Sequence, residues 1–339
     1  MLAPGKTAMI APLLEVTALV KRYEGGGPLR RRRAVYALNG VSFEISRGET
    51  LGLVGESGSG KSTLGRVVIR LAEASAGSVR FEGEEVLPLK GAALRALRRR
   101  MQMVFQDPYS SLNPRMRAGT AVAEGLEIHR LLPRRDIPGR VAQLFEEVGL
   151  DATYTTRYPH ELSGGQRQRV GIARALAVDP SFLICDEPVS ALDVSVQAQV
   201  LNLLKGLQRK RGLSFLFIAH DLAVVRQLAH RVAVMYFGRI VELAAAETIV
   251  HNPRHPYTRA LLSAVPQPDP GRRQTRIVLS GEPPKPTDPP PGCPFFSRCF
   301  HPMKNARCTT ELPPLRPVAA SLVACHYAEH TPEIVPSGP

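Results

Sequence analysis

The stretch that decides the fold reads TLGLVGESGSGKS and runs from residue 50 to residue 62. Its first part, residues 50–54, is a short apolar run of the kind that forms a buried strand. Its second part, residues 55–62, fits the pattern G-x-x-x-x-G-K-[ST], and a helix is expected after it over residues 62–71. This order predicts a loop whose backbone N–H groups surround a phosphate, with the helix dipole adding to the attraction.

The predicted phosphate loop supplies the first candidate site residues. We expect Lys61 to bridge the β- and γ-phosphates of a nucleotide, and the hydroxyl of Ser62 to bind Mg²⁺. The nucleotide-binding residues expected here are Gly55, Glu56, Ser57, Gly58, Ser59, Gly60, Lys61, Ser62 and Thr63.

A second apolar run, residues 181–186, ends in two carboxylates. Asp186 at the strand end is expected to hold Mg²⁺ through water, and Glu187 to polarise an attacking water molecule. Cys185, inside the same run, is interpreted as a small core residue. Together with the phosphate loop, this pair predicts nucleotide hydrolysis.

Further strands and helices alternate along the chain. Buried strands are expected at residues 101–105 and 214–219, and shorter strands within residues 13–54 and 79–86. Helices are expected at residues 92–100, 166–177 and 194–211, together with helical patterns over residues 115–150 that Pro133 and Pro138 interrupt. Strand and helix in this rhythm predict an α/β fold with a parallel sheet and right-handed crossovers.

The composition limits the classes of protein that this chain can belong to. With 339 residues, 44% hydrophobic and 22% charged, it is long enough for about two domains with ordinary cores. Five Cys are too few for a disulfide-stapled secreted scaffold. No long uncharged apolar run or signal peptide is visible, so we expect a protein kept in the cytosol.

The net charge of +14 favours polyanionic partners: nucleic acid, anionic lipid headgroups or phosphates. A solvated basic surface is the alternative, and charge alone does not choose among them. The run Arg30–Arg33 is interpreted as a solvated loop, with a contact to anionic headgroups as the other interpretation.

The pentapeptide LSGGQ at residues 162–166 precedes an expected helix and makes a second phosphate-binding helix start. Two phosphate sites in one chain imply that they do not serve the same nucleotide. With this pentapeptide, the chain resembles the ATP-binding cassette (ABC) ATPases. The resemblance implies that Leu162, Ser163, Gly164, Gly165 and Gln166 close over ATP held by a partner subunit.

The remaining elements of that family follow in order. Gln106 matches the Q-loop, which contacts Mg²⁺ and the attacking water, and His220 matches the switch histidine beside the γ-phosphate. The resemblance implies that Tyr23 stacks on adenine, with Tyr36 as the alternative. Four residues match the D-loop at the dimer interface: Ser190, Ala191, Leu192 and Asp193.

Longer segments resemble the dipeptide/oligopeptide importer ATPases in particular. They are FQDPYSSLNP at 105–114, RYPHELSGGQ at 157–166, CDEPVSALDVSVQAQ at 185–199 and HNPRHPYTRALLSAVP at 251–266. The resemblance covers residues 13 to 328, and its last segment belongs to the C-terminal extension of that subfamily. It implies a bacterial or archaeal uptake system with a substrate-binding protein, two permeases and a second, related ATPase.

The fold class we expect is therefore a P-loop NTPase (RecA-like) α/β core with an antiparallel β subdomain, a helical subdomain and a small Pro- and Cys-rich extension. The ATP-binding domain is expected at residues 13–250, its helical subdomain at 107–178 and the extension at 251–330. The chain is expected to be a peripheral ATPase on the cytoplasmic face of the bacterial membrane, powering peptide uptake, with no nucleic acid partner. The alternatives are the same role in a nickel, glutathione or murein-peptide importer, or a soluble ABC ATPase acting on nucleic acid.

Four cysteines, Cys293, Cys299, Cys308 and Cys325, lie in the extension with spacings of 5, 8 and 16 residues. Disulfides are disfavoured in the cytosol, and no C-x₂₋₄-C zinc knuckle is present. Four such thiolates fit an iron–sulfur cluster at least as well as zinc, and metal-free thiols stay open as a third interpretation. The resemblance implies a [4Fe–4S] cluster. Because the phosphate loop lies outside the extension, we expect ATP binding to survive the loss of these cysteines.

Overall fold

The structure is a computed structural model that describes residues 11–25, 33–265 and 276–331. Within these residues the main sheet has eight strands, in the order β11-β12-β10-β9-β3-β8-β7-β6. They are β3 (Thr50–Val54), β6 (Met101–Val104), β7 (Phe182–Asp186), β8 (Ser214–Ala219), β9 (Arg231–Tyr236), β10 (Arg239–Ala245), β11 (Arg316–Val318) and β12 (Ser321–Val323).

The part of this sheet that carries the candidate site is parallel. Strands β9, β3, β8, β7 and β6 pair in parallel, as the alternation of strands and helices predicts. Strands β3, β7 and β8 are buried along their whole length, because both faces of a parallel sheet are covered. The four buried strands expected from apolar runs are confirmed, although β6 and β7 are each one residue shorter than expected.

A second, antiparallel sheet covers the parallel core. Its strand order is β2-β1-β4-β5, with β1 (Leu14–Gly25), β2 (Arg33–Ile45), β4 (Ala76–Phe81) and β5 (Glu84–Glu85). Leu14 and Phe81 of this sheet share one hydrophobic cluster with Leu51 and Ile184 of the main sheet. The strand expected over residues 79–86 is interrupted at its middle, where Glu82 and Gly83 adopt positive φ and turn the chain.

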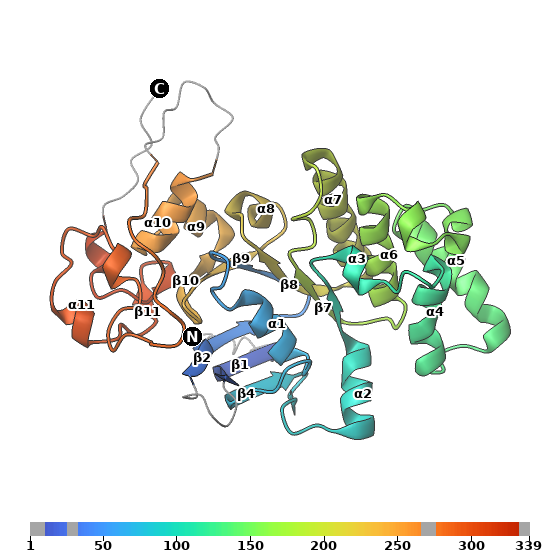
Figure 1. Ribbon diagram of the computed structural model, residues 1–339, viewed down its shortest axis with the longest axis horizontal. Coiled ribbons are helices and arrows are strands. Elements are labelled where there is room, and N and C mark those ends of the chain that lie inside the picture. The colour runs from blue at the N-terminus through green and yellow to red at the C-terminus, as the bar shows by residue number, and fades with distance from the viewer. Residues whose placement is uncertain (1–10, 26–32, 266–275, 332–339) are drawn as a thin grey trace, which may run out of the picture.

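The helices surround the main sheet (Figure 1). The α-helices are α1 (Lys61–Val68), α2 (Gly91–Arg100), α3 (Pro108–Ser111), α4 (Ala118–Ile128), α5 (Ile137–Glu147), α6 (Gly164–Leu176), α7 (Val194–Arg211), α8 (Leu222–Arg226), α9 (Ala246–His251), α10 (Pro256–Ser263) and α11 (Arg307–Thr310). Short 3₁₀ helices are η1 (Arg134–Asp136), η2 (Ala152–Thr156), η3 (Pro159–Glu161), η4 (Phe296–Arg298) and η5 (Ala328–His330). Helix α1 ends before the expected residue 71, because Arg70 takes a left-handed φ of 60° and closes the last turn.

Helices α3 to α6 form the helical group that lies at the right of Figure 1. Leu126 of α4, Phe145 of α5 and Val170 of α6 are buried in its core. Pro138 does not separate two helices as the sequence suggested, since it lies in the first turn of α5. A proline is tolerated there because the N–H it lacks would have no partner inside the helix.

The C-terminal extension, at the left of Figure 1, is joined to the main sheet. Strand β12 pairs antiparallel with β10, and β11 pairs with β12, so two strands of the extension extend the sheet edge. Phe295 of the extension is buried in the same hydrophobic cluster as strands β7 and β8. The extension therefore shares both a sheet and a core with the part of the chain that carries the expected phosphate loop.

Candidate functional site

The expected site residues meet at the carboxyl ends of four parallel strands. Lys61 follows β3, Gln106 follows β6, Asp186 ends β7 and His220 follows β8. In open α/β sheets ligands bind at this edge, because loops and helix N-termini gather there. The parallel topology thus brings together residues from four separate parts of the sequence.

The phosphate loop connects β3 to α1 and has the expected shape. Gly60 precedes α1 with φ of 106°, and a Cβ atom at this position would lie 2.4 Å from the carbonyl oxygen of Ala37, so only glycine fits. Lys61 is 4% exposed, and its Nζ donates to the carbonyl oxygens of Gly55 at 2.7 Å and Glu56 at 3.1 Å. The side chain thus lies along the loop that it is expected to serve.

Burial lowers the pKa of Lys61, and the negative charges of Glu187, Asp186 and Glu56 oppose that shift. The negative charges of the three carboxylates favour the charged form of this buried ammonium group. A charged Lys61 at the start of α1 is what binding of a polyphosphate requires.

The two expected magnesium ligands nearest the loop are in contact. Ser62 Oγ donates to Asp186 Oδ1 at 2.8 Å, and Asp186 is 1% exposed. Burial raises the pKa of Asp186, whereas the hydrogen bond from Ser62 lowers it. A hydroxyl and a carboxylate at this distance offer the hard oxygen ligands that Mg²⁺ prefers. Gln106, the third expected ligand, directs its amide nitrogen to Glu187.

Glu187 lies between Gln106 and His220. Its Oε2 accepts a hydrogen bond from Gln106 Nε2 at 2.9 Å and lies 3.6 Å from His220 Nδ1. The backbone of Glu187 has φ of 44°, which non-glycine residues adopt rarely and which is found at functional sites. The structure therefore brings together, as one group at the sheet edge, Glu187 and Gln106, expected at the attacking water, and His220, expected beside the γ-phosphate.

The LSGGQ segment begins helix α6, as expected. Ser163 is the N-cap: its Oγ accepts from the N–H of Gln166 at 3.3 Å, and Gln166 Oε1 accepts from the N–H of Ser163 at 2.8 Å. This capping box fixes the first turn. Ser163 and Gly164 are exposed, and α6 lies with the helical group rather than beside α1 (Figure 1). The two expected phosphate sites are thus separate.

The expected D-loop, residues 190–193, connects β7 to α7. Ser190 Oγ donates to the carbonyl oxygen of Glu187 at 3.1 Å, and Asp193 caps α7 by accepting from the N–H of Val196 at 2.9 Å. Ser190, Ala191 and Asp193 are exposed. The segment is therefore hydrogen-bonded to the backbone of Glu187, the candidate catalytic residue, while most of its side chains are exposed to solvent.

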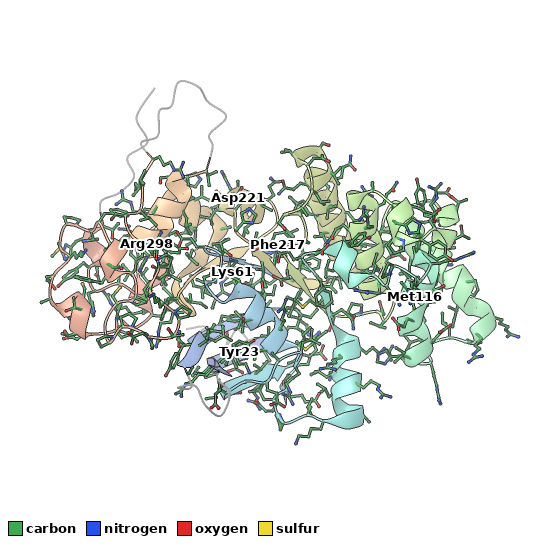
Figure 2. All side chains as sticks on the ribbon, in the orientation of Figure 1. Tyr23, Lys61, Met116, Phe217, Asp221 and Arg298 are labelled. Atoms are coloured by element: carbon green, nitrogen blue, oxygen red, sulfur yellow. The ribbon has the colours of Figure 1, made fainter. Side chains whose placement is uncertain are left out.

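The two expected adenine-stacking candidates differ in their surroundings. Tyr23 on β1, labelled in Figure 2, is 42% exposed. Lys21 Nζ lies 4.6 Å from its ring centroid. Tyr36 on β2 is less exposed, and its N–H donates to the carbonyl oxygen of Pro286 in the extension at 2.9 Å. The face of Tyr23 is the more accessible one for a flat ring.

Two residues that the sequence did not single out contact the phosphate loop. The hydroxyl of Tyr257 accepts from the N–H of Glu56 at 2.7 Å. Arg298 donates from Nη1 and Nη2 to the two carboxylate oxygens of Glu56, at 2.6 and 2.9 Å. Both come from the extension. In the sequence, the HPYT segment that holds Tyr257 indicates a family resemblance and nothing about a contact with the phosphate loop.

The four cysteines of the extension line one pocket, together with His301, His326 and aromatic side chains. Burial raises the pKa of Cys293 to about 12 and that of Cys325 to about 11, and the thiols influence one another. In the described residues, however, no three His, Cys, Asp or Glu side chains are placed to hold a metal ion. The geometry thus gives a shared four-thiol pocket but does not support the expected iron–sulfur cluster or its zinc alternative.

Two further expectations concern the membrane. Among the helices that the structure describes, none combines the length and apolar character needed to cross a bilayer. Residues 30–32 of the Arg30–Arg33 run lie outside the described residues.

Comparison with known families and proteins gives consistent matches. Residues 38–190 match the family described as ABC transporter, and residues 241–308 match that described as oligopeptide/dipeptide transporter, C-terminal region. A Brucella ovis protein named as a peptide import ATP-binding protein is 52% identical over 307 residues, covering 91% of this chain and 95% of its own. The oligopeptide transport ATP-binding protein OppF of Bacillus subtilis is 54% identical over 277 residues, covering 81% of this chain and 89% of its own.

Solved structures of ATP-binding cassettes are similar as well. The cassette MJ0796, solved as a dimer in a post-hydrolysis state with ADP and Pi, superposes with a TM-score of 0.62 at 28% identity. The superposition covers 69% of this chain and 98% of that one.

Proposed function

The chain belongs to the ABC transporter ATPases of the oligopeptide/dipeptide group, and from this premise we propose that it powers the uptake of di- and oligopeptides through a membrane importer. The match of residues 241–308 to the C-terminal region of oligopeptide/dipeptide transporters carries the peptide assignment. The ATPase chemistry is carried by the site at the sheet edge. The relatives named for peptide import support both parts.

Hydrolysis uses the groups gathered around β3, β7 and β8. The loop N–H groups and Lys61 hold the phosphates. Ser62 and Asp186 would hold Mg²⁺, which would neutralise charge on the phosphate oxygens. Glu187 is the general base, Gln106 orients it and the water, and His220 contacts the γ-phosphate. These roles are supported by the hydrogen bond from Gln106 to Glu187 and by the distance of 3.6 Å between His220 Nδ1 and Glu187 Oε2.

The active unit is a dimer of cassettes. Ser163 and Gly164 present the N-terminus of α6 to solvent, and a helix N-terminus is a favourable place for a phosphate. Since α6 lies away from α1, the phosphate that it meets belongs to a second cassette. The dimeric MJ0796 cassette supports this arrangement. As the second chain we propose a related ATPase.

The other partners are two permeases and a substrate-binding protein. We place the chain on the cytoplasmic face of the bacterial membrane as a peripheral subunit. The helical subdomain, residues 107–178, transmits closure of the dimer to a permease near Gln106. Peptide specificity then lies in the binding protein and permeases rather than in this chain.

Reconstitution of the complete importer tests the function. The chain is assembled with its co-purifying permeases and ATPase in proteoliposomes, and ATP hydrolysis and uptake are measured with the binding protein. Peptide-loaded binding protein is expected to stimulate both. Stimulation by nickel- or glutathione-loaded binding protein, with none by peptide, would show that the substrate class is wrong while the ATPase role holds.

We also propose that Cys293, Cys299, Cys308 and Cys325 hold a [4Fe–4S] cluster. The four thiols line one pocket, and four cysteine thiolates are the ligand set of such clusters, which supports the proposal. A cluster there would tie together a segment rich in proline and poor in apolar residues.

Anaerobically purified protein is expected to be brown, with about four iron and four sulfide per chain. Replacing Cys293 and Cys299 with Ser should remove the colour and iron and speed proteolysis of the extension. Iron analysis, the absorption spectrum and limited proteolysis measure these effects. The control is Cys185→Ala, which removes the thiol buried in β7 and should leave the iron content unchanged. One tightly held zinc would change the metal assigned, whereas metal-free anaerobic protein with equal protease resistance would contradict the metal centre.

A further inference from the structure

Glu56 is the second residue of the phosphate loop, and it is held at three points. Its carbonyl oxygen accepts from Lys61 at 3.1 Å and its N–H donates to the Tyr257 hydroxyl at 2.7 Å. Its carboxylate accepts two hydrogen bonds from Arg298, at 2.6 and 2.9 Å. Two of these three contacts come from the extension, and Arg298 is 242 residues away in sequence.

The contact with Arg298 is of a strong type. Two parallel N–H···O bonds between a guanidinium and a carboxylate fix both direction and distance. The Arg298 side chain is 8% exposed and that of Glu56 31%, so solvent screens the pair in part, from the Glu56 side. The hydrogen bonds to the Glu56 carboxylate raise the pKa of Arg298. Removing the Glu56 carboxylate would leave the charge of the buried Arg298 uncompensated.

Arg298 and Tyr257 are themselves held by aromatic packing. The rings of Tyr236, Tyr257 and Phe295 pack against one another, with centroids 4.7 to 5.5 Å apart. The guanidinium of Arg298 lies 6.0 Å from the centroid of Tyr236, which belongs to β9 of the main sheet. Because Tyr257 and Phe295 are fully buried, this support is part of the core and not a surface contact. Figure 2 shows Arg298 on the extension and Lys61 in the ATP-binding part.

We propose that Arg298 is a positioning residue of the ATP site: together with the Tyr257 hydroxyl it fixes the start of the phosphate loop through Glu56, so that the extension takes part in ATP binding. Arg298 acts through Glu56 and does not touch the nucleotide. The loop grips the phosphates in both the ground state and the transition state, so a loosened loop weakens both equally. Such a loss raises the KM for ATP and leaves kcat nearly unchanged.

The test compares the two partners of the pair. Arg298→Ala and Glu56→Gln are each expected to raise the KM for ATP about tenfold in the assembled importer, with kcat within about twofold of the wild type. Equilibrium binding of a fluorescent ATP analogue to the purified full chain should weaken by the same factor. Arg298→Lys, which keeps the charge but not the fork, should lie between wild type and Arg298→Ala.

The double variant shows whether the two residues act through one another. If they do, Arg298→Ala with Glu56→Gln should raise KM no more than the larger single change. The matched control is Arg307→Ala, which removes an exposed arginine paired with Glu311 in the same extension and should leave KM unchanged.

The proposal rests on the nucleotide-binding role of the loop, which Lys61→Ala tests separately by loss of ATP binding. If Arg298→Ala does not fold, the proposal is tested with Glu56→Gln, because this substitution changes only a residue of the phosphate loop. Wild-type ATP affinity in folded Glu56→Gln, or multiplied effects of about a hundredfold in the double variant, would overturn the proposal.

Discussion

Glu187→Gln is expected to abolish ATP turnover in the assembled importer while ATP stays bound and the cassette dimer stays closed. The amide keeps the size of the side chain but cannot accept a proton from water, and loss of a general base costs roughly 10²–10⁴ in rate. Lys61, Ser62 and Asp186 are unchanged, so the phosphates remain held. Steady-state hydrolysis measures the first effect, and retention of labelled ATP on a sizing column measures the second.

Lys61→Ala serves as the contrasting variant. It removes a buried positive charge from the phosphate loop, so ATP binding itself should fail and no closed dimer should form. The two variants thus lose activity for different reasons, which nucleotide retention distinguishes. Wild-type hydrolysis by importer assembled with Glu187→Gln would remove Glu187 from the role of general base.

Much of this site could be predicted from the sequence because its residues follow buried strands. Runs such as residues 50–54 and 181–186 are apolar and short, and parallel strands align their carboxyl ends. The position of Lys61, Asp186 and Glu187 at one edge follows from that rule. The hydrogen bond between Gln106 and Glu187 has the same origin, since β6 and β7 are neighbours in the sheet.

The attachment of the extension could not be predicted in the same way. The pairing of β12 with β10, and that of Arg298 with Glu56, join residues far apart in sequence, and no local periodicity marks such contacts. Arg298 looks like an ordinary basic residue in a basic chain. Its contact with the phosphate loop can be recognised only in the folded structure, where Arg298 packs beside the aromatic cluster of Tyr236 and Phe295.

This contact changes one expectation drawn from the sequence. ATP binding was expected to be independent of the four cysteines because they lie in a separate part of the chain. The two parts share a sheet, and Arg298 lies between Cys293 and Cys299, next to the latter. A loosened extension is therefore expected to weaken ATP binding through Glu56 rather than leave it intact.

The second large effect is expected from Ser163→Arg, at the N-terminus of α6. Arginine removes the hydroxyl that caps the helix and places a long side chain where the partner's γ-phosphate would lie. Closure around the partner's ATP is then blocked, and turnover of the complex should fall about 10²-fold, a loss of the size seen when one preorganised donor is removed. Nucleotide binding at the chain's own Lys61 should persist, because α6 lies away from α1 (Figure 1).

Two comparisons separate this effect from general damage to the helical subdomain. Gln143→Arg adds the same side chain at an exposed position of α5 and should leave turnover unchanged. Ser163→Ala removes only the cap, so it should destabilise α6 by about 1 kcal/mol with a smaller loss of turnover. Photo-crosslinking of an azido-ATP to each ATPase chain shows which site is affected. Full-rate hydrolysis by a strictly monomeric preparation, or by the Ser163→Arg complex, would contradict the proposal that residues 162–166 bind the partner's nucleotide. In either case hydrolysis would proceed without a phosphate bound at the N-terminus of α6.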